Sequence, residues 1–408
     1  MIKKSTLVYI MLVFAVLLQN LFFHIINPTS TTTIMLMADI FAMFIFSYFV
    51  GENHKCRFLY RYITSVLLVV VIPQTIYGFA QGQTFNEYID VIKGPIYILL
   101  AVPVMKIFDC DESMTRALNM IEVLTVISLA ILLANSIMLN EFGRPLLPFD
   151  YFQLPPNGRN NRLRLLLISD FLSFVSIYSF SSLVSKTGNL LFNFLSFVIC
   201  FGAEFYIEQT RMIEMAIIAA CIIIYAISID KKKYKFLLYL IAVTACLYGL
   251  FADWFSGVFS SFSIQNTSTG VSTLYRTIEW KAALGLIIDH PFMGTGMIRN
   301  YRFSVNLTGI PVMFDHTDIG LIGTITYIGM IGTFVLFLIP YYRCFTTFLR
   351  IQGKKQYDRD RFFFVGLFVF ITVTAATIIV TDNSRIFVWP FILAVEEYTR
   401  RICILEGN

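Results

Sequence analysis

The chain has 408 residues, of which 57% are hydrophobic and 14% charged, and its formal net charge at pH 7 is +5. Soluble globular proteins carry roughly 25% charged residues, so this composition excludes a soluble enzyme, a soluble nucleic-acid-binding protein and a secreted disulfide scaffold. The apolar residues fall in repeated runs of about 17–25 residues, the length that crosses a bilayer as a helix.

These runs predict a membrane-embedded helical bundle. Only helices satisfy every backbone hydrogen bond within one such run, so the expected fold is an all-α polytopic bundle that forms one integral membrane domain over residues 1–408. The first run lacks a small-residue cleavage site, which indicates an uncleaved first helix. The twelve predicted spans cover about 5–26, 34–50, 62–80, 91–108, 118–140, 165–184, 190–207, 212–229, 236–252, 318–342, 362–381 and 385–399.

The placement of Lys and Arg predicts the orientation. Twenty of the 31 Lys and Arg residues fall in alternate segments between these spans, which the positive-inside rule assigns to the cytoplasm together with both termini. Nine of the other eleven are Arg, and arginine kept on the disfavoured side indicates that it binds an anion there. None of the seven Cys forms a CxxC pair and the predicted outer loops hold no Cys, so neither a metal motif nor an external disulfide is expected.

Charges inside the predicted spans indicate a polar interior. Lys93, Glu122 and Asp170 each fall within an apolar run or close to its end. A charge near the bilayer centre costs roughly 2.5–3.5 kcal/mol, so we expect these side chains to face the interior of the bundle or to pair with one another.

Two predicted outer loops stand out by length. The first covers 141–164 and is rich in Pro, Asn and Arg, and the second covers 253–317 between the ninth and tenth spans. Loops longer than about 15 residues are usually functional or disordered. Because the second contains Trp, Tyr and a helix-like stretch, we expect it to form an ordered, partly helical extracytoplasmic cap.

The larger loop carries a compound motif. Arg276 and Trp280 are four positions apart and would share a face of a short helix, which Pro291 and the following Gly-x-Gly would end. Such a helix on the outer membrane surface would direct Arg276 at a phosphate group, although an amphipathic helix that its Arg merely anchors has the same pattern. We interpret His290 as structural, capping or ending the helix. The motif comprises Arg276, Trp280, His290, Pro291, Gly294 and Gly296.

A second candidate lies where the chain re-enters the membrane. His316 has an unperturbed pKa of about 6.5, which suits a general base at neutral pH. Asp318 follows it by two positions. The alternative is an interfacial His that is hydrogen-bonded to a neighbouring acid.

Further outer arginines are candidate anion ligands. Arg211 follows a hairpin too short to leave the membrane face, although it could instead pair with Glu208 or Glu214. Arg159 and Arg162 lie in the first outer loop, where a merely solvated role is the alternative. The predicted anion-binding set is Arg211, Arg276, Arg159, Arg162 and Arg299.

Together these features resemble the O-antigen ligase/polymerase family of bacterial surface-polysaccharide assembly. Thr210–Arg211 opens a span where the family carries a similar pair, and Arg276-x-x-x-Trp280 precedes His290-Pro291-x-x-Gly294-x-Gly296, the family's most recognisable pattern. His316 then precedes a span containing four glycines. The motifs cover about 190–345, and the remainder resembles the family by topology.

The resemblance implies a glycosyltransferase of the bacterial plasma (inner) membrane that needs neither a cofactor nor a metal. Its partners would be a glycan linked to undecaprenyl diphosphate, the lipid bilayer and a chain-length regulator protein, with no nucleic acid. It implies that Arg211 and Arg276 bind the diphosphate and that His316 deprotonates the acceptor hydroxyl, with Asp318 orienting it or sharing that role. Trp280, His290, Gly294 and Gly296 would support the site.

Three functions remain open from the sequence. Family ligases commonly have Asn and a hydrophobic run after the His, whereas Thr317–Asp318–Ile319–Gly320 is more similar to the polymerase branch, which we favour. A polymerase extends O-antigen, capsule or exopolysaccharide chains, and a ligase transfers the finished glycan to lipid A core. A flippase for the same lipid-linked glycan would place its site near the bilayer midplane, often between repeated halves, and no repeat is visible here.

Overall fold

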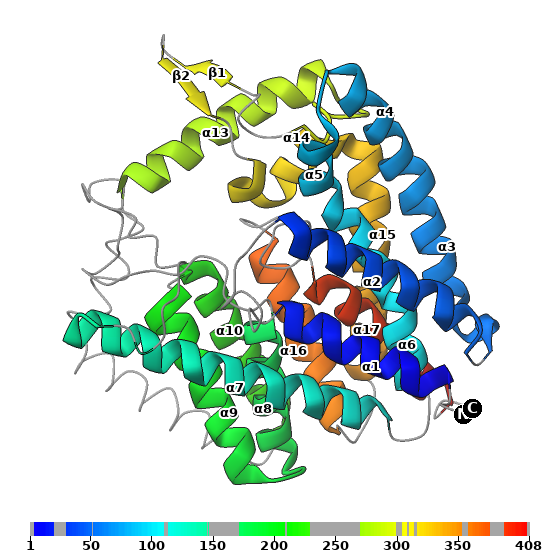
Figure 1. The fold of residues 1–408 in the computed structure, drawn as a ribbon, viewed down its shortest axis with the longest axis vertical. Coiled ribbons are helices and arrows are strands. Elements are labelled where there is room, and N and C mark those ends of the chain that lie inside the picture. The colour runs from blue at the N-terminus through cyan, green and yellow to red at the C-terminus, as the bar shows by residue number, and fades with distance from the viewer. Residues whose placement is uncertain are drawn as a thin grey trace.

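The computed structural model describes residues 4–19, 30–50, 52–109, 113–144, 146, 171–208, 210–228, 270–298, 304–307, 310–313, 316–352, 358–375 and 387–405. These residues form a helical bundle with one short β-hairpin (Figure 1). The polytopic helical fold predicted from the apolar runs is confirmed. The predicted span 236–252 lies outside the described residues, and each of the others overlaps a helix in the part of it that is described.

The N-terminal half contributes α1 to α7, several of them joined by short 3₁₀ or π turns. Thr84 begins α5 through a capping box, in which its side chain accepts from the Glu87 N–H and the Glu87 carboxylate accepts from the Thr84 N–H. The elements are α1 (Lys4–Gln19), α2 (Ser30–Tyr48), η1 (Asn53–Cys56), α3 (Arg57–Val66), η2 (Leu67–Val71), α4 (Ile72–Ala80), α5 (Phe85–Tyr97), η3 (Ile98–Leu100), α6 (Ala101–Phe108) and α7 (Ser113–Phe142).

The C-terminal half contains the remaining helices and the hairpin. Strands β1 (Ser304–Leu307) and β2 (Ile310–Met313) pair antiparallel, and with α13 they occupy part of the predicted loop 253–317. Most of the loop 141–164 lies outside the described residues. The helical elements are α8 (Phe171–Ser185), α9 (Leu190–Ala203), η5 (Glu204–Glu208), α10 (Arg211–Ser228), α13 (Gly270–Asp289), η8 (His316–Ile319), α14 (Gly320–Thr333), η9 (Phe334–Leu338), α15 (Ile339–Gln352), α16 (Arg359–Thr374) and α17 (Val388–Leu405).

Five helical stretches of the described chain are long and apolar enough to cross a membrane. The described chain also contains four shorter apolar helices. The long stretches keep many large apolar side chains on their outer surface, as expected where lipid is the solvent. They cover Asn53–Ala80, Val91–Phe108, Met114–Phe142, Leu190–Ile207 and Gly320–Ile351.

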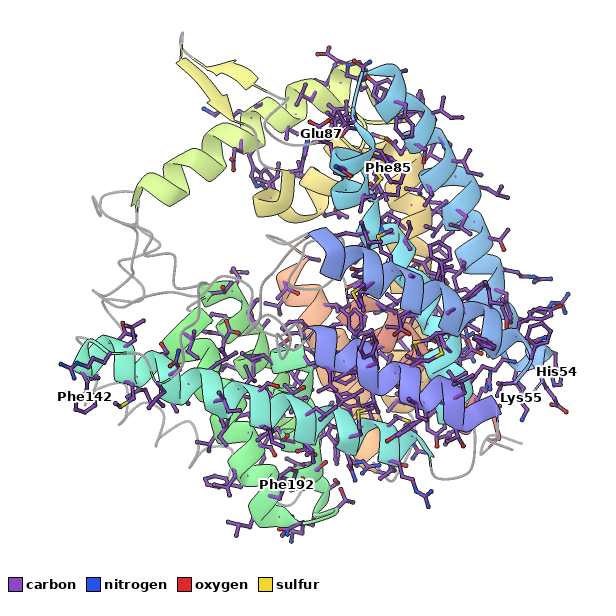
Figure 2. The ribbon with its side chains drawn as sticks, in the orientation of Figure 1. His54, Lys55, Phe85, Glu87, Phe142 and Phe192 are labelled. Carbon is purple, nitrogen blue, oxygen red and sulfur yellow. The ribbon has the colours of Figure 1, made fainter. Side chains whose placement is uncertain are left out.

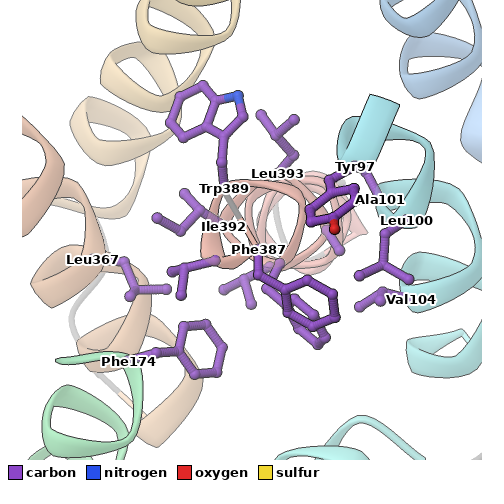
Figure 3. Packing of buried hydrophobic residues seen from close by; sticks show 14 of the residues in the cluster. Tyr97, Leu100, Ala101, Val104, Phe174, Leu367, Phe387, Trp389, Ile392 and Leu393 are labelled. Carbon is purple, nitrogen blue, oxygen red and sulfur yellow. The ribbon is translucent and has the colours of Figure 1, made fainter. Parts of the chain in front are cut away.

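Helix α17 forms the centre of the bundle. Apolar side chains of α6 lie on one side of its N-terminal half and those of α8 and α16 on the other (Figure 3). Phe387 and Phe391 are fully buried, and the Phe171 ring of α8 packs edge-on against both, at centroid distances of 5.3 and 5.1 Å. The shortest predicted span is therefore the core element around which the others pack.

Charged residues from distant segments meet at one end of the bundle. Lys55 and Arg401 both form ion pairs with Asp109, each at 3.2 Å, and Arg343 pairs with Glu396 at 2.8 Å. Figure 2 shows Lys55 at this end, away from Phe85 and Glu87. The positive-inside rule assigns these Lys and Arg residues to one side of the membrane, and the structure brings them together. That this side is the cytoplasm stays a prediction.

Removing Arg343 should destabilise this end strongly. Its guanidinium donates to Glu396 and Glu397, whose side chains are 1% and 9% exposed. In Arg343→Ala both carboxylates lose their main partner, so we expect a loss of about 3 kcal/mol. Thermal unfolding of the detergent-solubilised protein would measure it. The exposed Arg350 on the same helix provides the control, and equal melting temperatures for Arg343→Ala and Arg350→Ala would contradict the prediction.

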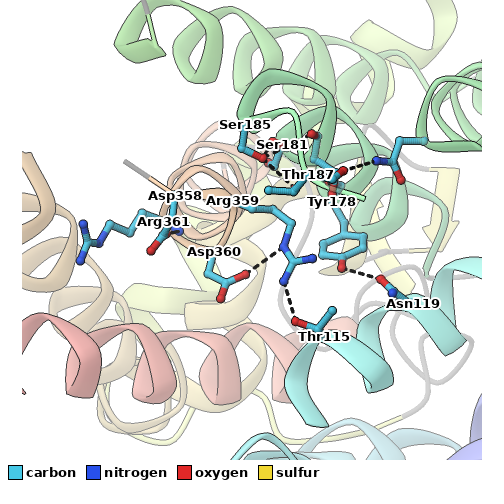
Figure 4. A network of polar contacts seen from close by, with 12 residues as sticks. Thr115, Asn119, Tyr178, Ser181, Ser185, Thr187, Asp358, Arg359, Asp360 and Arg361 are labelled. Carbon is cyan, nitrogen blue, oxygen red and sulfur yellow. Dashed lines mark hydrogen bonds and ion pairs between the residues drawn. The ribbon is translucent and has the colours of Figure 1, made fainter. Parts of the chain in front are cut away.

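A polar network ties the start of α16 to α7 and α8 (Figure 4). Arg359 pairs with Asp360 at 3.0 Å, donates to the Thr115 hydroxyl at 2.7 Å and lies over the Tyr178 ring. Tyr178 in turn donates to Asn119 at 2.8 Å. Burial raises the pKa of the Asp360 carboxyl, and the Arg359 guanidinium partly offsets that rise.

The interior charges predicted from the sequence have different environments. Glu122 is buried and accepts a hydrogen bond of 2.7 Å from Ser179. Lys93 is half-buried, and Asp170 lies outside the described residues. The expected polar interior is therefore present at Glu122.

Candidate functional site

His316 begins the 3₁₀ turn η8, directly before α14. Its side chain is 1% exposed, and its ring packs against that of Tyr327, with centroids 4.8 Å apart. Tyr327 lies about two turns along α14, so η8 folds back beside the helix that follows it. Gly323 permits this return, because a Cβ there would collide with the His316 carbonyl oxygen. The imidazole is therefore held by packing rather than carried on a free loop.

Helix α14 is broken beside this ring. Gly329 has φ 72° and ψ 177°, a conformation that is essentially restricted to glycine. In an uninterrupted helix the Met330 N–H would donate to Thr326 and the Ile331 N–H to Tyr327. At the break both N–H groups turn away, which leaves two buried carbonyl groups and two N–H groups in need of partners.

The segment after α13 supplies these partners, and we call residues 291–298 the insertion loop. Met330 N donates to Pro291 O at 2.9 Å, and Ile331 N donates to Phe292 O at 3.4 Å. In the other direction, the N–H groups of the insertion loop reach the freed carbonyl oxygens, with Thr295 N to Thr326 O at 2.7 Å and Gly296 N to Tyr327 O at 3.0 Å. The loop thus exchanges hydrogen bonds with the broken helix.

This exchange explains the two motif glycines. Gly294 and Gly296 have φ of +68° and +94°. A Cβ at Gly294 would lie 2.7 Å from the carbonyl oxygens of Thr326 and Tyr327, and a Cβ at Gly296 would collide with the Tyr77 ring. The pattern was predicted to end a helix. Helix α13 does end at Asp289, and the glycines also let the loop dock in the break of α14.

Helix α13 packs beside η8. Ala283 and Ile319 are fully buried in one small cluster, so the face of α13 that carries Ala283 adjoins the turn that holds His316. Arg276 is seven positions before Ala283 and lies on the same side of the helix. Trp280 is 43% exposed, and His290 is exposed just beyond the helix end, where its N–H donates to Leu286 O.

The structure places the other predicted site residues only in part. Arg211 is the first residue of α10, and Asp318 lies in η8, two positions after His316. The side chains of Arg211, Arg276 and Asp318 lie outside the described part of the chain, as do Arg159, Arg162 and Arg299 entirely. The site brought together by the described residues therefore consists of His316, the broken helix α14, the insertion loop and α13.

Residues 195–337 match the family model described as O-antigen ligase. The matched segment covers roughly a third of the 408 residues and runs from α9 to η9, so it includes α13, the insertion loop, η8 and the break of α14. The resemblance to the O-antigen ligase/polymerase family is thereby confirmed. The search of curated proteins found no match.

Tyr327 and Gly329 are residues of this site to which the sequence assigned no role. Gly329 was visible only as one of several glycines in an apolar span, where glycine commonly serves helix packing. Tyr327 gave no signal, because its part depends on the ring of a residue eleven positions away and on a loop from another helix.

Proposed function

We propose that the protein is a polymerase of lipid-linked oligosaccharide repeat units. It transfers a growing glycan from undecaprenyl diphosphate onto the next lipid-linked repeat at the outer face of the plasma membrane. The supporting observation is that the segment matching the O-antigen ligase family contains a buried histidine whose ring packs against the broken helix, to which the motif-bearing loop is hydrogen-bonded. Loop, turn and helix are joined by backbone hydrogen bonds and packing, which keeps the imidazole in a fixed orientation.

The proposed reaction is an inverting displacement at the anomeric carbon. His316 accepts the proton of the acceptor hydroxyl as its oxygen attacks, and the bond between the anomeric carbon and the diphosphate oxygen breaks. Undecaprenyl diphosphate leaves with the bonding electrons. Arg276 and Arg211 stabilise the charge that develops on it, because a guanidinium presents a planar fork of donors to phosphate oxygens. Asp318 orients His316 or shares its proton.

A deletion strain separates the candidate functions. Without a polymerase, surface glycans would be limited to single repeats, and without a ligase, long chains would accumulate on undecaprenyl diphosphate. A flippase would move lipid-linked repeats across liposome membranes without changing their length. Long chains on the lipid carrier in the deletion strain, or transport without chain growth in liposomes, would overturn the polymerase assignment.

Arg276→Lys should lose most polymerase activity, on the order of tenfold or more, although the protein is still inserted. The positive charge is kept, but a single ammonium cannot reproduce bidentate contact with the diphosphate. Gel analysis of glycan ladders in the complemented deletion strain would measure the loss. Lys281→Arg, an exposed exchange on the same helix, provides the control. Normal ladders from Arg276→Lys would count against its role.

A further inference from the structure

One buried side-chain amide in the N-terminal half binds the insertion loop through two hydrogen bonds. Gln74 of α4 is 3% exposed, and its Nε2 donates to the Met293 carbonyl oxygen at 2.9 Å. Its Oε1 accepts from the Met297 N–H, also at 2.9 Å. One side chain therefore joins two loop residues that are four positions apart and uses both its donor and its acceptor.

Helix α4 and the turn that follows it make two further contacts with the same loop. The buried Gln83 amide, just beyond the helix end, donates to the Met297 carbonyl oxygen at 2.8 Å. The Tyr77 ring, one turn after Gln74, lies where only a glycine at position 296 leaves room for it. Figure 1 shows α4, α13 and α14 together at one end of the molecule. The loop is thus held by α4 on one side and by the broken α14 on the other.

A continuous chain of contacts leads from Gln74 to His316. Gln74 fixes Met297, the neighbouring Gly296 donates to the Tyr327 carbonyl oxygen, and the Tyr327 ring packs on the imidazole. We propose that Gln74 is a positioning residue that orients His316 through the insertion loop. This inference rests on the proposed function, and it assigns a part to α4, which lies outside the segment that matches the O-antigen ligase family.

An amide suits this position because the loop presents one acceptor and one donor. In Gln74→Leu, which has a similar volume, the buried Met297 N–H loses its acceptor and the Met293 carbonyl loses its donor, so the loop should loosen. A glutamate is different, because a protonated carboxyl group offers one donor and one acceptor, whereas a carboxylate only accepts. Gln74→Glu should therefore hold the loop at low pH and release it at high pH.

Hydrogen exchange tests, independently of activity, whether Gln74 holds the insertion loop in place. In the full-length protein in nanodiscs, we expect Gln74→Leu to speed amide exchange across 290–298 by about tenfold, because Met297 N loses its acceptor. Gln81→Leu is the matched control, since this exposed glutamine ends the same helix. Unchanged exchange in Gln74→Leu would refute the claim that Gln74 holds the insertion loop.

Activity tests the positioning role. With lipid-linked repeat units as substrate, we expect Gln74→Leu to lower kcat by about tenfold or more while the KM for the donor changes little, because misorientation of a base slows the chemical step. The ratio of Gln74→Glu to wild-type kcat should rise as the pH falls from 8 to 6, and the ratio for Gln81→Glu should stay flat. The folded fraction of each variant is measured at each pH and kcat is expressed per folded molecule, so a lower folded fraction cannot produce that ratio.

The two readouts separate this inference from the proposed function. Faster exchange with normal kcat would overturn the positioning role, as would a flat ratio for Gln74→Glu. Suppose that exchange is faster in Gln74→Leu but the wild-type protein does not lengthen glycans. This result would refute the polymerase assignment, and the finding that Gln74 holds the insertion loop would stand.

Discussion

His316→Ala should abolish chain extension while the protein remains in the membrane and still binds its lipid-linked donor. A positioned general base contributes about 10²–10⁴-fold to the rate, and alanine has no group that can accept the proton. The imidazole is buried against Tyr327, so the variant must first be checked for a normal elution profile in detergent. Glycan ladders in the complemented deletion strain and binding of a fluorescent lipid-linked donor would measure the two properties.

The chain offers a histidine control for this experiment. His54 is exposed and lies at the end of the bundle that carries the ion-pair cluster, so His54→Ala should give normal ladders. Loss of donor binding in His316→Ala would indicate a structural role for the imidazole. Chains of normal length would remove it from the mechanism altogether.

Gly329→Ala should lose about 3 kcal/mol or more of stability, together with most of the activity. A Cβ would have to adopt a backbone conformation that is essentially confined to glycine, and it would collide with the Phe292 carbonyl oxygen of the insertion loop. The strain would be relieved if α14 straightened and its own N–H groups returned to Thr326 and Tyr327. We therefore expect a lower melting temperature and faster hydrogen exchange across 290–298.

Gly202→Ala tests whether any glycine in an apolar helix behaves in this way. Gly202 lies in α9. Apart from its two chain neighbours and the backbone of its own helix, no atom lies within 4 Å of a Cβ built there. Alanine is favoured over glycine in a helix by roughly 0.5–1 kcal/mol, so this variant should match or exceed wild-type stability. If both variants melted alike, the break in α14 would not depend on the conformation of Gly329.

The exchange of hydrogen bonds between the insertion loop and α14 connects these two predictions. Tyr327 joins the two, because its carbonyl oxygen, freed by the break, accepts from Gly296 and its ring packs on His316. A change at Gly329 should therefore reach His316 without touching it. The proposed base is thus supported by Tyr327 of α14, and α4 in turn holds the insertion loop that is hydrogen-bonded to Tyr327.

The sequence by itself determined the class of the molecule and the position of its helices along the chain. Apolar runs of membrane-spanning length have one physical solution for their backbone, so the predicted spans coincide with helices wherever the chain is described. The motif around Gly294 and Gly296, and the histidine before α14, were also visible, because Pro291 followed closely by Gly-x-Gly indicates a loop and a histidine at the start of a span is a candidate for chemistry.

Only the tertiary structure decided how these pieces fit together. Nothing in the composition of α14 distinguishes Gly329, which breaks the helix, from glycines that allow close packing, because the break is stable only when another segment satisfies the freed backbone groups. Gln74 likewise reads as an ordinary polar residue in an apolar helix until Met293 and Met297, over two hundred positions away, supply its partners. Hydrogen bonds between segments so distant in the chain leave no periodic trace in the sequence, so the support of His316 became evident only from the fold.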